Sequence, residues 1–347
     1  MEQRLTKRWY SDDSGPSLLQ PLSWLYDAIV RARRQAFAHG WLATHHVGKP
    51  VIVVGNLTVG GTGKTPMVIW LARQLTARGL RVGIVSRGYG SQSQEAPRLV
   101  EAGSRWQDVG DEPVLLSRRT GCPTIVGRDR VAAARALIER HVDLIIADDG
   151  LQHLRLARDC EIVVIDGARG FGNRRMLPAG PLREPVSRVG KADFLIVNGA
   201  MEHSSLTRVG VPVARAVQMT LQPGPALRVD GEASSRPLED FRGRPVHAVA
   251  GIGNPARFFR DLRARGLEVI EHPFPDHHPF TRAELSFGDE LPVLMTEKDA
   301  VKCRAGAVPR WWYIPTEAVF AEAQARELVD GVLRKIGPLT SLTEVGS

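Results

Sequence analysis

A glycine-rich run between residues 55 and 65 carries the strongest chemical signal in this chain. It reads Gly-Asn-Leu-Thr-Val-Gly-Gly-Thr-Gly-Lys-Thr and directly follows the apolar run 51–54. A buried strand that breaks into such a turn and then opens a helix is the setting of a phosphate-binding P-loop. Glycines let backbone N–H groups converge on phosphate oxygens, and the helix N-terminus adds partial positive charge there. The run therefore predicts binding of a nucleoside triphosphate.

The side chains of Lys64 and Thr65 have separate expected roles in this loop. Lys64 would reach the β- and γ-phosphates, and the Thr65 hydroxyl would ligate Mg²⁺. The other candidate phosphate contacts are Thr58, Gly60, Gly61, Thr62 and Gly63.

The loop departs from the strict P-loop pattern at one position. Thr58 stands where that pattern has glycine, and we expect Gly60 and Gly61 to supply the turn instead. A dinucleotide-binding loop is a weaker interpretation, because its third glycine would fall at position 66, where Pro66 stands.

Asp148 and Asp149 end a second apolar run, 142–147. Carboxylates at the end of a buried strand hold Mg²⁺ in P-loop enzymes, directly or through water. The alternative is a pair of turn or helix-capping residues. With the P-loop upstream we favour the metal site, although the sequence does not say which aspartate touches the ion.

Two shorter segments contain candidate acid–base groups. In Gly-Asp-Glu-Pro (110–113), local pattern favours Asp111 as a helix N-cap, and an exposed N-cap carboxylate is also able to accept a proton. In Pro-Asp-His-His-Pro (275–279), adjacent histidines point to opposite sides of extended chain, so a shared metal is not expected. A surface loop is one interpretation of that segment, and a histidine that tunes a carboxylate across a cleft is the other.

Two further segments are ambiguous taken alone. The run 172–185 is too long and too rich in proline for a regular element, and its arginines, with Arg169, would suit an anionic substrate. Thr-Glu-Lys-Asp at 296–299 is similar to a guanine-reading motif, but its lysine is one residue too late. Specificity for GTP is therefore not supported.

Strands and helices alternate along the chain, which predicts an α/β fold with a parallel sheet and right-handed crossovers. We expect a P-loop NTPase-like core with a second, smaller α/β lobe and an N-terminal amphipathic helix. In the second lobe, helices are expected at 281–287 and 317–335. The expected divisions are a membrane-facing segment at 1–42, a P-loop kinase domain at 43–221, a hinge or linker at 222–245 and the smaller lobe at 246–347. Two lobes joined by a hinge form a cleft whose closure excludes water during phosphoryl transfer.

Composition narrows the classes of partner and compartment. The formal net charge of +8 and the pI of about 9.8 favour an anionic partner, but no basic motif interleaved with aromatic residues points to nucleic acid. The three cysteines are far apart and form no CxxC pair, which suits a reducing compartment and excludes a thiolate metal site. With no apolar signal segment and no run long enough to span a bilayer, we expect a cytoplasmic protein.

The stretch 21–42 predicts an amphipathic helix that begins at Pro21. Its apolar residues lie near one face, tryptophans flank it, and three arginines crowd the same segment: Leu22, Trp24, Leu25, Tyr26, Ile29, Arg31, Arg33, Arg34, Ala36, Phe37 and Trp41. Such a helix can lie in a membrane interface or pack on the domain, and the pattern alone does not decide between them.

An ordered set of segments resembles one family, the tetraacyldisaccharide 4′-kinases of lipid A biosynthesis. The resemblance runs from about Pro21 to about Ile314. The matching segments are Val-Gly-Gly-Thr-Gly-Lys-Thr-Pro at 59–66, Ser-Arg-Gly-Tyr-Gly at 86–90, Gly-Asp-Glu-Pro at 110–113, Asp-Asp-Gly-Leu-Gln-His at 148–153, Leu-Pro-Ala-Gly-Pro-Leu-Arg-Glu-Pro at 177–185 and Thr-Glu-Lys-Asp-Ala-Val-Lys at 296–302.

This resemblance implies transfer of the ATP γ-phosphate to the 4′-hydroxyl of an acylated glucosamine disaccharide 1-phosphate, forming lipid IVA. It implies ATP and Mg²⁺, with Asp111 as the catalytic carboxylate and His277, rather than His278, as its partner. It thereby overturns the local preference for Asp111 as a mere cap. Arg183 and Glu184 match a loop that faces the sugar head group. Asn173, Gln152 and His153 are further candidate substrate residues.

The resemblance also implies work at the cytoplasmic face of the bacterial inner membrane. It favours the membrane interpretation of 21–42, and it explains the positive charge, because glycolipid substrate and bilayer are both anionic. Neither nucleic acid nor an obligate protein partner is expected.

The strongest rival is an ATPase of the partitioning or arsenite-pump type, whose signature lysine is replaced here by Val59. A regulatory nucleotide-binding module is the third class, but it would not need the acidic pair or Asp111. Adenine contacts are not readable from the sequence, and Asn198 and Tyr89 are the only candidates.

Overall fold

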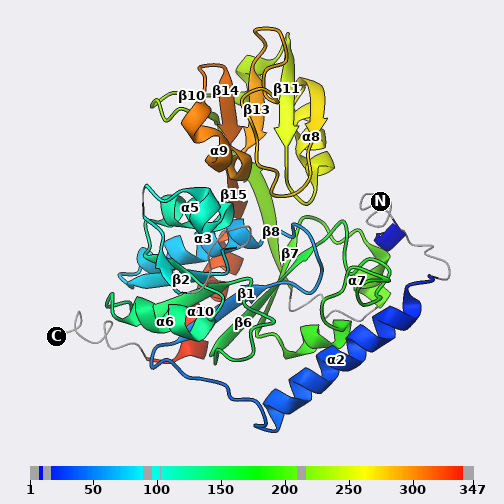
Figure 1. The fold of residues 1–347 in the computed structure, drawn as a ribbon, viewed down its shortest axis with the longest axis vertical. Coiled ribbons are helices and arrows are strands. Elements are labelled where there is room, and N and C mark those ends of the chain that lie inside the picture. The colour runs from blue at the N-terminus through cyan, green and yellow to red at the C-terminus, as the bar shows by residue number, and fades with distance from the viewer. Residues whose placement is uncertain (1–7, 11–16, 89–95, 102, 209–215, 339–347) are drawn as a thin grey trace.

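The chain folds into two α/β lobes, each built on its own sheet (Figure 1). The structure is a computed structural model that describes residues 8–10, 17–88, 96–101, 103–208 and 216–338. In Figure 1 the larger lobe lies below and the smaller lobe above, and helix α2 runs along the outside of the larger lobe.

The larger lobe contains a nine-stranded sheet in the order β15-β8-β7-β6-β1-β5-β2-β4-β3. Strands β8 to β4 in that order are parallel, and the two edge strands, β15 and β3, are antiparallel to their neighbours. The expected parallel sheet is confirmed. The strands are β1 (Val51–Gly55), β2 (Val82–Ser86), β3 (Arg98–Leu99), β4 (Thr124–Val126), β5 (Leu144–Asp148), β6 (Cys160–Asp166), β7 (Phe194–Asn198), β8 (Ala216–Pro223) and β15 (Thr316–Val319).

Helices cover both faces of this sheet, so its central strands are apolar on both sides. Every residue of β1 and β5 is buried, as expected for strands inside a parallel sheet. One core lies under α3, α5 and α10, and the other lies under α6 and the segments that follow β5. The helices of this lobe are α2 (Gln20–Ala38), α3 (Lys64–Thr76), α4 (Trp106–Val109), α5 (Asp111–Thr120), α6 (Arg130–Ile138), α7 (Ser204–Arg208) and α10 (Glu322–Ile336).

The smaller lobe is a six-stranded sheet in the order β10-β9-β14-β13-β11-β12, with α8 on one face and α9 on the other. Its four strands β14, β13, β11 and β12 are parallel. The elements are β9 (Ala226–Arg228), β10 (Ser235–Arg236), β11 (Pro245–Ala250), α8 (Pro255–Arg263), β12 (Glu268–Pro273), β13 (Val293–Thr296), α9 (Glu297–Cys303) and β14 (Trp311–Ile314).

Two antiparallel strands, β8 and β15, connect the lobes. The structure also corrects the linker expected at 222–245. Pro223 still belongs to β8, and β9 and β10 lie within the expected linker yet pair in the smaller sheet. The prolines and glycines that suggested a linker stand between short strands, whose backbone groups are satisfied by sheet pairing.

The end of the chain also differs from expectation. Residues expected to start a helix at 317 form β15, and α10 begins at Glu322. This helix packs on the larger lobe, where Leu328, Val329 and Val332 are buried. The larger lobe therefore contains the elements up to β8 and also β15 and α10. The smaller lobe is an insertion between β8 and β15.

The segment 281–287, expected to be a helix, forms turns. The Glu284 carboxylate accepts hydrogen bonds from the Thr281 backbone N–H and hydroxyl, both at 2.8 Å, which satisfies a single turn. Phe280 and Phe287 point into the core of the smaller lobe at either end. Their spacing places apolar side chains inward without a continuous helical face.

Candidate active site

The glycine-rich run forms a loop between β1 and the N-terminus of α3. Gly60 and Gly63 have φ angles of 99° and 97°, in the left-handed region that favours glycine. A Cβ at Gly63 would also lie only 2.8 Å from Nδ2 of Asn198. The loop therefore favours glycine at both positions for their conformation, and at Gly63 also for space.

Thr58 is tolerated because the backbone is extended there. It forms an antiparallel bridge with Leu182, and the neighbouring Val59 N–H donates to the Pro181 carbonyl at 2.9 Å. Both Thr58 and Thr62 are buried, but only Thr62 lines the cavity described below. The run 172–185 thus supports the P-loop from one side.

The two aspartates that follow β5 have opposite environments. Asp149 lies 3.6 Å from Lys64 Nζ and 3.0 Å from an Arg183 guanidinium nitrogen. Burial opposes its charge, but Lys64 and Arg183 outweigh burial and lower the pKa of Asp149 below its ordinary value. Asp148 accepts a hydrogen bond from the Ser86 hydroxyl at 3.1 Å, and burial, with the charges of Glu112 and Asp149, raises its pKa to about 7.

These residues fit a bound Mg²⁺ ion. Oδ1 of Asp148 is buried without a hydrogen-bond partner, so a cation beside it would satisfy the carboxylate and favour its ionised form. Thr65 and Asp149 line the same cavity. Among the described residues no group of three or more His, Cys, Asp or Glu side chains forms a metal-binding cluster.

Asp111 lies at the start of α5, where it is almost fully buried. Gly110, with φ 91°, is the N-cap, so Asp111 is the first helical residue and not the cap that the local pattern favoured. One of its oxygens accepts the Glu112 backbone N–H at 2.8 Å. The carboxylate is therefore fixed at the end of a helix whose dipole favours negative charge.

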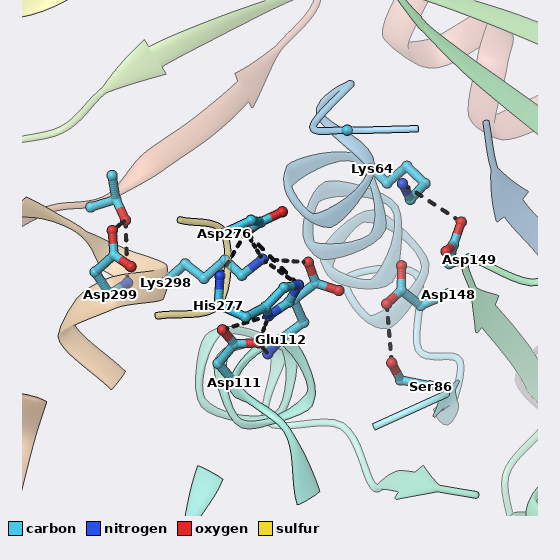
Figure 2. Close-up of polar contacts among 12 residues, drawn as sticks. Lys64, Ser86, Asp111, Glu112, Asp148, Asp149, Asp276, His277, Lys298 and Asp299 are labelled. Atoms are coloured by element: carbon cyan, nitrogen blue, oxygen red, sulfur yellow. Dashed lines mark hydrogen bonds and ion pairs between the residues drawn. The ribbon is translucent and has the colours of Figure 1, made fainter. Parts of the chain in front are cut away.

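His277 reaches Asp111 from the smaller lobe. Its Nδ1 lies 3.1 and 3.0 Å from the two Asp111 carboxylate oxygens. Burial opposes the charge of Asp111, but the hydrogen bond from His277 and the charges of Lys298 and Lys302 outweigh it and lower the pKa of Asp111. His278 instead contacts Glu284 at 2.9 Å. Figure 2 shows the carboxylate and the imidazole facing each other, with Asp148 and Asp149 farther to the right, beside Ser86 and Lys64.

A cavity of about 740 Å³ lies between the lobes and brings these groups together. The P-loop, the acidic pair and His277 line it, and so do residues of the smaller lobe near Gly253 and Arg257. A Cβ at Gly253 would lie 2.9 Å from the Gly61 backbone nitrogen, so the smaller lobe touches the P-loop itself. A P-loop, an acidic pair and a carboxylate held by a histidine are the parts of a phosphoryl-transfer site.

Comparison with known proteins decides which family uses these parts. The family model described as tetraacyldisaccharide-1-P 4′-kinase matches residues 16–334. The chain belongs to this family. It is therefore an ATP-dependent kinase of lipid A biosynthesis.

Relatives agree with this assignment along nearly the whole kinase chain. A tetraacyldisaccharide 4′-kinase of Alkalilimnicola ehrlichii is 50% identical, over 93% of this chain and 94% of its own. One from Pseudomonas aeruginosa strain LESB58 is 48% identical, over 91% and 93%. The crystal structure of LpxK from Aquifex aeolicus in complex with ATP has a TM-score of 0.73 at 28% identity and covers 92% of this chain and 98% of that one.

Several cavity-lining positions of the kinase escaped the sequence interpretation. Glu112 and Lys298 line the cavity, although the first was taken for a helix start and the second for a failed guanine motif. The loop 251–254 was also missed. The signal was present, because Gly-Ile-Gly-Asn follows a buried strand and precedes α8, in the same order as the P-loop.

Of the expected substrate residues of the kinase, Arg183 lies on the cavity wall. Glu184 is buried beside α2, where it accepts from Gln152 Nε2 at 2.8 Å and pairs with Arg34. The Asn173 side chain donates to the Ala179 carbonyl at 3.0 Å. These contacts join α2 to the loops that contain Gln152 and Glu184 and stabilise the loop of Asn173. Neither Glu184 nor Asn173 lines the cavity.

His153 follows Gln152 directly in the chain. Burial, together with Arg130 and Arg87, lowers the pKa of His153 to about 4. Of the two candidate adenine contacts, Asn198 donates to the Thr62 carbonyl at 3.0 Å and so supports the P-loop, while Tyr89 lies outside the described residues.

Helix α2 of the kinase turns several large apolar side chains away from the larger lobe. Small and polar groups face the larger lobe: the Ser23 hydroxyl donates to the Met176 carbonyl at 2.8 Å, and Tyr26 OH reaches the Arg183 carbonyl at 3.4 Å. The outward apolar side chains are more than half exposed: Leu22, Trp24, Leu25 and Ile29. Within the described ranges no helix is long and apolar enough to cross a bilayer.

The N-terminal segment is not uniformly outward-facing. Trp9 and Tyr10 line the cavity, and the Tyr10 hydroxyl donates to the Val59 carbonyl at 3.0 Å. Of the residues expected to face a membrane, Tyr10 instead contacts the P-loop, and Trp9 donates its indole N–H to the Pro178 carbonyl at 3.1 Å.

Proposed function

We propose that this kinase transfers the γ-phosphate of ATP to the 4′-hydroxyl of tetraacyldisaccharide 1-phosphate, forming lipid IVA, with Asp111 as the base. The observation that carries the proposal is the Asp111–His277 pair, in which His277 lies at the wall of the P-loop cavity and holds the buried Asp111 carboxylate directly behind it. A sugar hydroxyl is a poor nucleophile, so a fixed carboxylate beside the phosphate site is the group that the reaction needs.

In this mechanism the protein mainly positions the reactants and neutralises charge. P-loop N–H groups and Lys64 would hold the β- and γ-phosphates. Asp111 would orient the hydroxyl and accept its proton late, when the phosphoryl group has largely transferred. His277, donating Nδ1–H to Asp111, keeps the carboxylate in place. Bound Mg²⁺, held by Thr65 and the acidic pair, would neutralise negative charge on the phosphates.

We further propose that α2 docks the kinase on the cytoplasmic face of the inner membrane. Its outward apolar face would enter the lipid interface, and exposed Arg31 and Arg33 would meet anionic head groups. The acyl chains of the glycolipid substrate could then stay in the bilayer while its head group enters the cavity. Arg183, on the cavity wall and within reach of Asp149, is a candidate contact for that head group.

Mass spectrometry of the glycolipid tests the reaction. Tetraacyldisaccharide 1-phosphate in detergent would be incubated with ATP, Mg²⁺ and either the wild-type protein or Lys64→Ala. We expect a gain of one phosphate with the wild-type protein and almost none with the variant. No gain by folded, ATP-binding wild-type protein would contradict the proposal and favour an ATPase with another acceptor.

A further inference from the structure

The segment 296–302 has no role in the mechanism above, although it lies against the catalytic pair. It forms the end of β13 and helix α9. The Thr296 hydroxyl accepts the Asp299 N–H at 3.2 Å and donates to the Asp299 carboxylate at 2.6 Å, which fixes the helix start. Lys298 and Lys302, four residues apart, consequently lie on the same side of α9, which packs on α5.

Lys298 reaches three acceptors that come from both lobes. Its Nζ lies 3.0 Å from Glu112 on α5, 3.2 Å from Asp276 and 3.3 Å from Nε2 of His277 (Figure 2). The side chain is 15% exposed. Burial works against its charge, but Glu112, Asp111 and Asp276 outweigh burial and raise the pKa of Lys298, so the ammonium is retained.

The contact with Nε2 determines the protonation of the imidazole. An ammonium group is only a donor, so Nε2 of His277 must accept. An ionised carboxylate is only an acceptor, so Nδ1 of His277 must carry the proton that is donated to Asp111. A second proton on Nε2 would place an N–H group against the ammonium at 3.3 Å. Both neighbours therefore select the same neutral tautomer.

We propose that Lys298 is a positioning residue that holds His277 as the neutral Nδ1–H tautomer and so keeps its hydrogen bond on Asp111 when the lobes are closed. This inference rests on the proposed role of Asp111 as the base. Because Lys298 also pairs with Glu112, the tautomer is selected only when the smaller lobe lies against α5. Closure and assembly of the catalytic pair are thereby the same event.

Lys302 places a second positive charge near Asp111. Its Nζ lies 2.8 Å from Asp299, 3.9 Å from Asp111 and 4.9 Å from the centre of the Phe280 ring. The described charged groups around the pair are thus Asp111 and Glu112 on α5, Asp276 on the His277 loop, and Lys298, Asp299 and Lys302 on α9.

Removal of the Lys298 charge should change the proton affinities of His277 and Asp111 in the same direction. Without a neighbouring cation, His277 takes up a second proton more readily, and the Asp111 carboxylate is also protonated more readily. Both changes act in the same direction, so the catalytic form is lost at higher pH as the solution is acidified. In a phosphate-binding role, by contrast, Lys298 would affect ATP affinity and leave the pH profile in place.

The first test is the pH dependence of kcat for Lys298→Met, Lys298→Arg and the control Lys335→Met. Lys335 pairs with Asp193 at 2.8 Å on an exposed surface and is not part of the site. We expect the acid limb of the Lys298→Met profile to move up by about one pH unit or more, with the KM for ATP changed less than about twofold. Lys298→Arg should restore most of the shift, and Lys335→Met should match the wild-type protein.

The second test observes His277 directly in nitrogen-edited NMR spectra of isotope-labelled histidine side chains, with the signal assigned by its loss in His277→Gln. We expect protonated Nδ1 and unprotonated Nε2 in the wild-type protein, and uptake of a second proton at higher pH in Lys298→Met. A proton on Nε2 of the wild-type protein would overturn the proposal even if Lys298→Met failed to fold. A raised KM for ATP with an unmoved pH profile would overturn it as well.

The two tests separate this proposal from the one on which it rests. If Asp111→Asn turned over normally, the base assignment would fail, whereas the NMR titration would still show whether Lys298 selects the His277 tautomer. An unchanged titration in Lys298→Met with an inactive Asp111→Asn would reject the role of Lys298 alone.

Discussion

Nδ1 of His277 lies 3.0 Å from Oδ2 of Asp111, across 166 positions of sequence and from one lobe to the other. The contact joins the first residue of α5 to a loop of the smaller lobe, and its His277 side borders the cavity that the P-loop lines. Because each partner comes from a different lobe, the pair exists only when the lobes are together. With Asp111 as the proposed base, phosphoryl transfer would be restricted to the closed state, from which water is excluded.

Replacement of Asp111 by asparagine should remove the base while keeping the shape of the side chain. We expect kcat to fall by about 10²–10⁴-fold, the usual contribution of general-base catalysis, with little change in the KM for ATP. Steady-state kinetics with glycolipid in detergent measures both. Asp240→Asn, at a half-exposed position of the smaller lobe, is the matched control. Normal turnover by Asp111→Asn would rule out the base assignment.

Substitution of the outward face of α2 should weaken membrane binding. In the triple variant Leu22→Asn, Leu25→Asn and Ile29→Asn, three side chains that are more than half exposed become polar. We expect sedimentation with anionic vesicles to drop at least about tenfold, since each apolar side chain contributes roughly 1.5–3 kcal/mol when fully buried.

Detergent-dispersed substrate provides the comparison for this variant. Its turnover should be retained, because the substituted side chains point away from the lobe and the cavity. Met201→Asn, an exposed apolar residue elsewhere on the surface, should bind vesicles like the wild-type protein. Unchanged vesicle binding by the triple variant would refute the docking role of α2.

Glu184→Gln distinguishes a structural role from a substrate contact. The carboxylate is 4% exposed and lies between Arg34, Gln152 and Arg188, so its removal takes one carboxylate partner from Arg34 and one from the buried Arg188, which also pairs with Glu161. We expect the free energy of unfolding to fall by about 3 kcal/mol in chemical denaturation, with the KM for ATP unchanged. A stable variant with a raised KM for the glycolipid would instead identify Glu184 as a substrate residue.

His153 should make stability depend on pH. Its pKa is about 4 in the folded protein, below the ordinary value of 6.5, because of burial and then the charges of Arg130 and Arg87. Between these values the unfolded chain binds a proton that the folded chain does not, so the free energy of unfolding falls as the pH decreases.

Denaturation of the wild-type protein and His153→Gln at pH values between about 4 and 6.5 measures this contribution. The wild-type protein should lose roughly 1–2 kcal/mol more than the variant, because the partly buried side chain is screened. His39→Gln, at the exposed end of α2, should retain the wild-type slope. Parallel curves for the wild-type protein and His153→Gln would contradict the prediction.

The sequence by itself determined the features whose physical causes are local. The P-loop was readable because glycine spacing, the apolar strand before it and the helix after it are neighbours in the chain. The buried strands of the parallel sheet were readable because they are apolar on both faces. The amphipathic pattern of 21–42 was also local, although it did not say which face would meet the lobe.

Only the tertiary structure decided the features that depend on contacts between distant segments. Lobe boundaries were misplaced because β9 pairs with β14, which lies far along the chain, and β10 pairs with β9. Glu184 was expected at the substrate, and its place beside α2 follows from arginines elsewhere. Lys298 had no readable role, because its acceptors become neighbours only when α9 packs on α5. Backbone propensity depends on adjacent residues, whereas a catalytic arrangement depends on the packing that brings remote residues together.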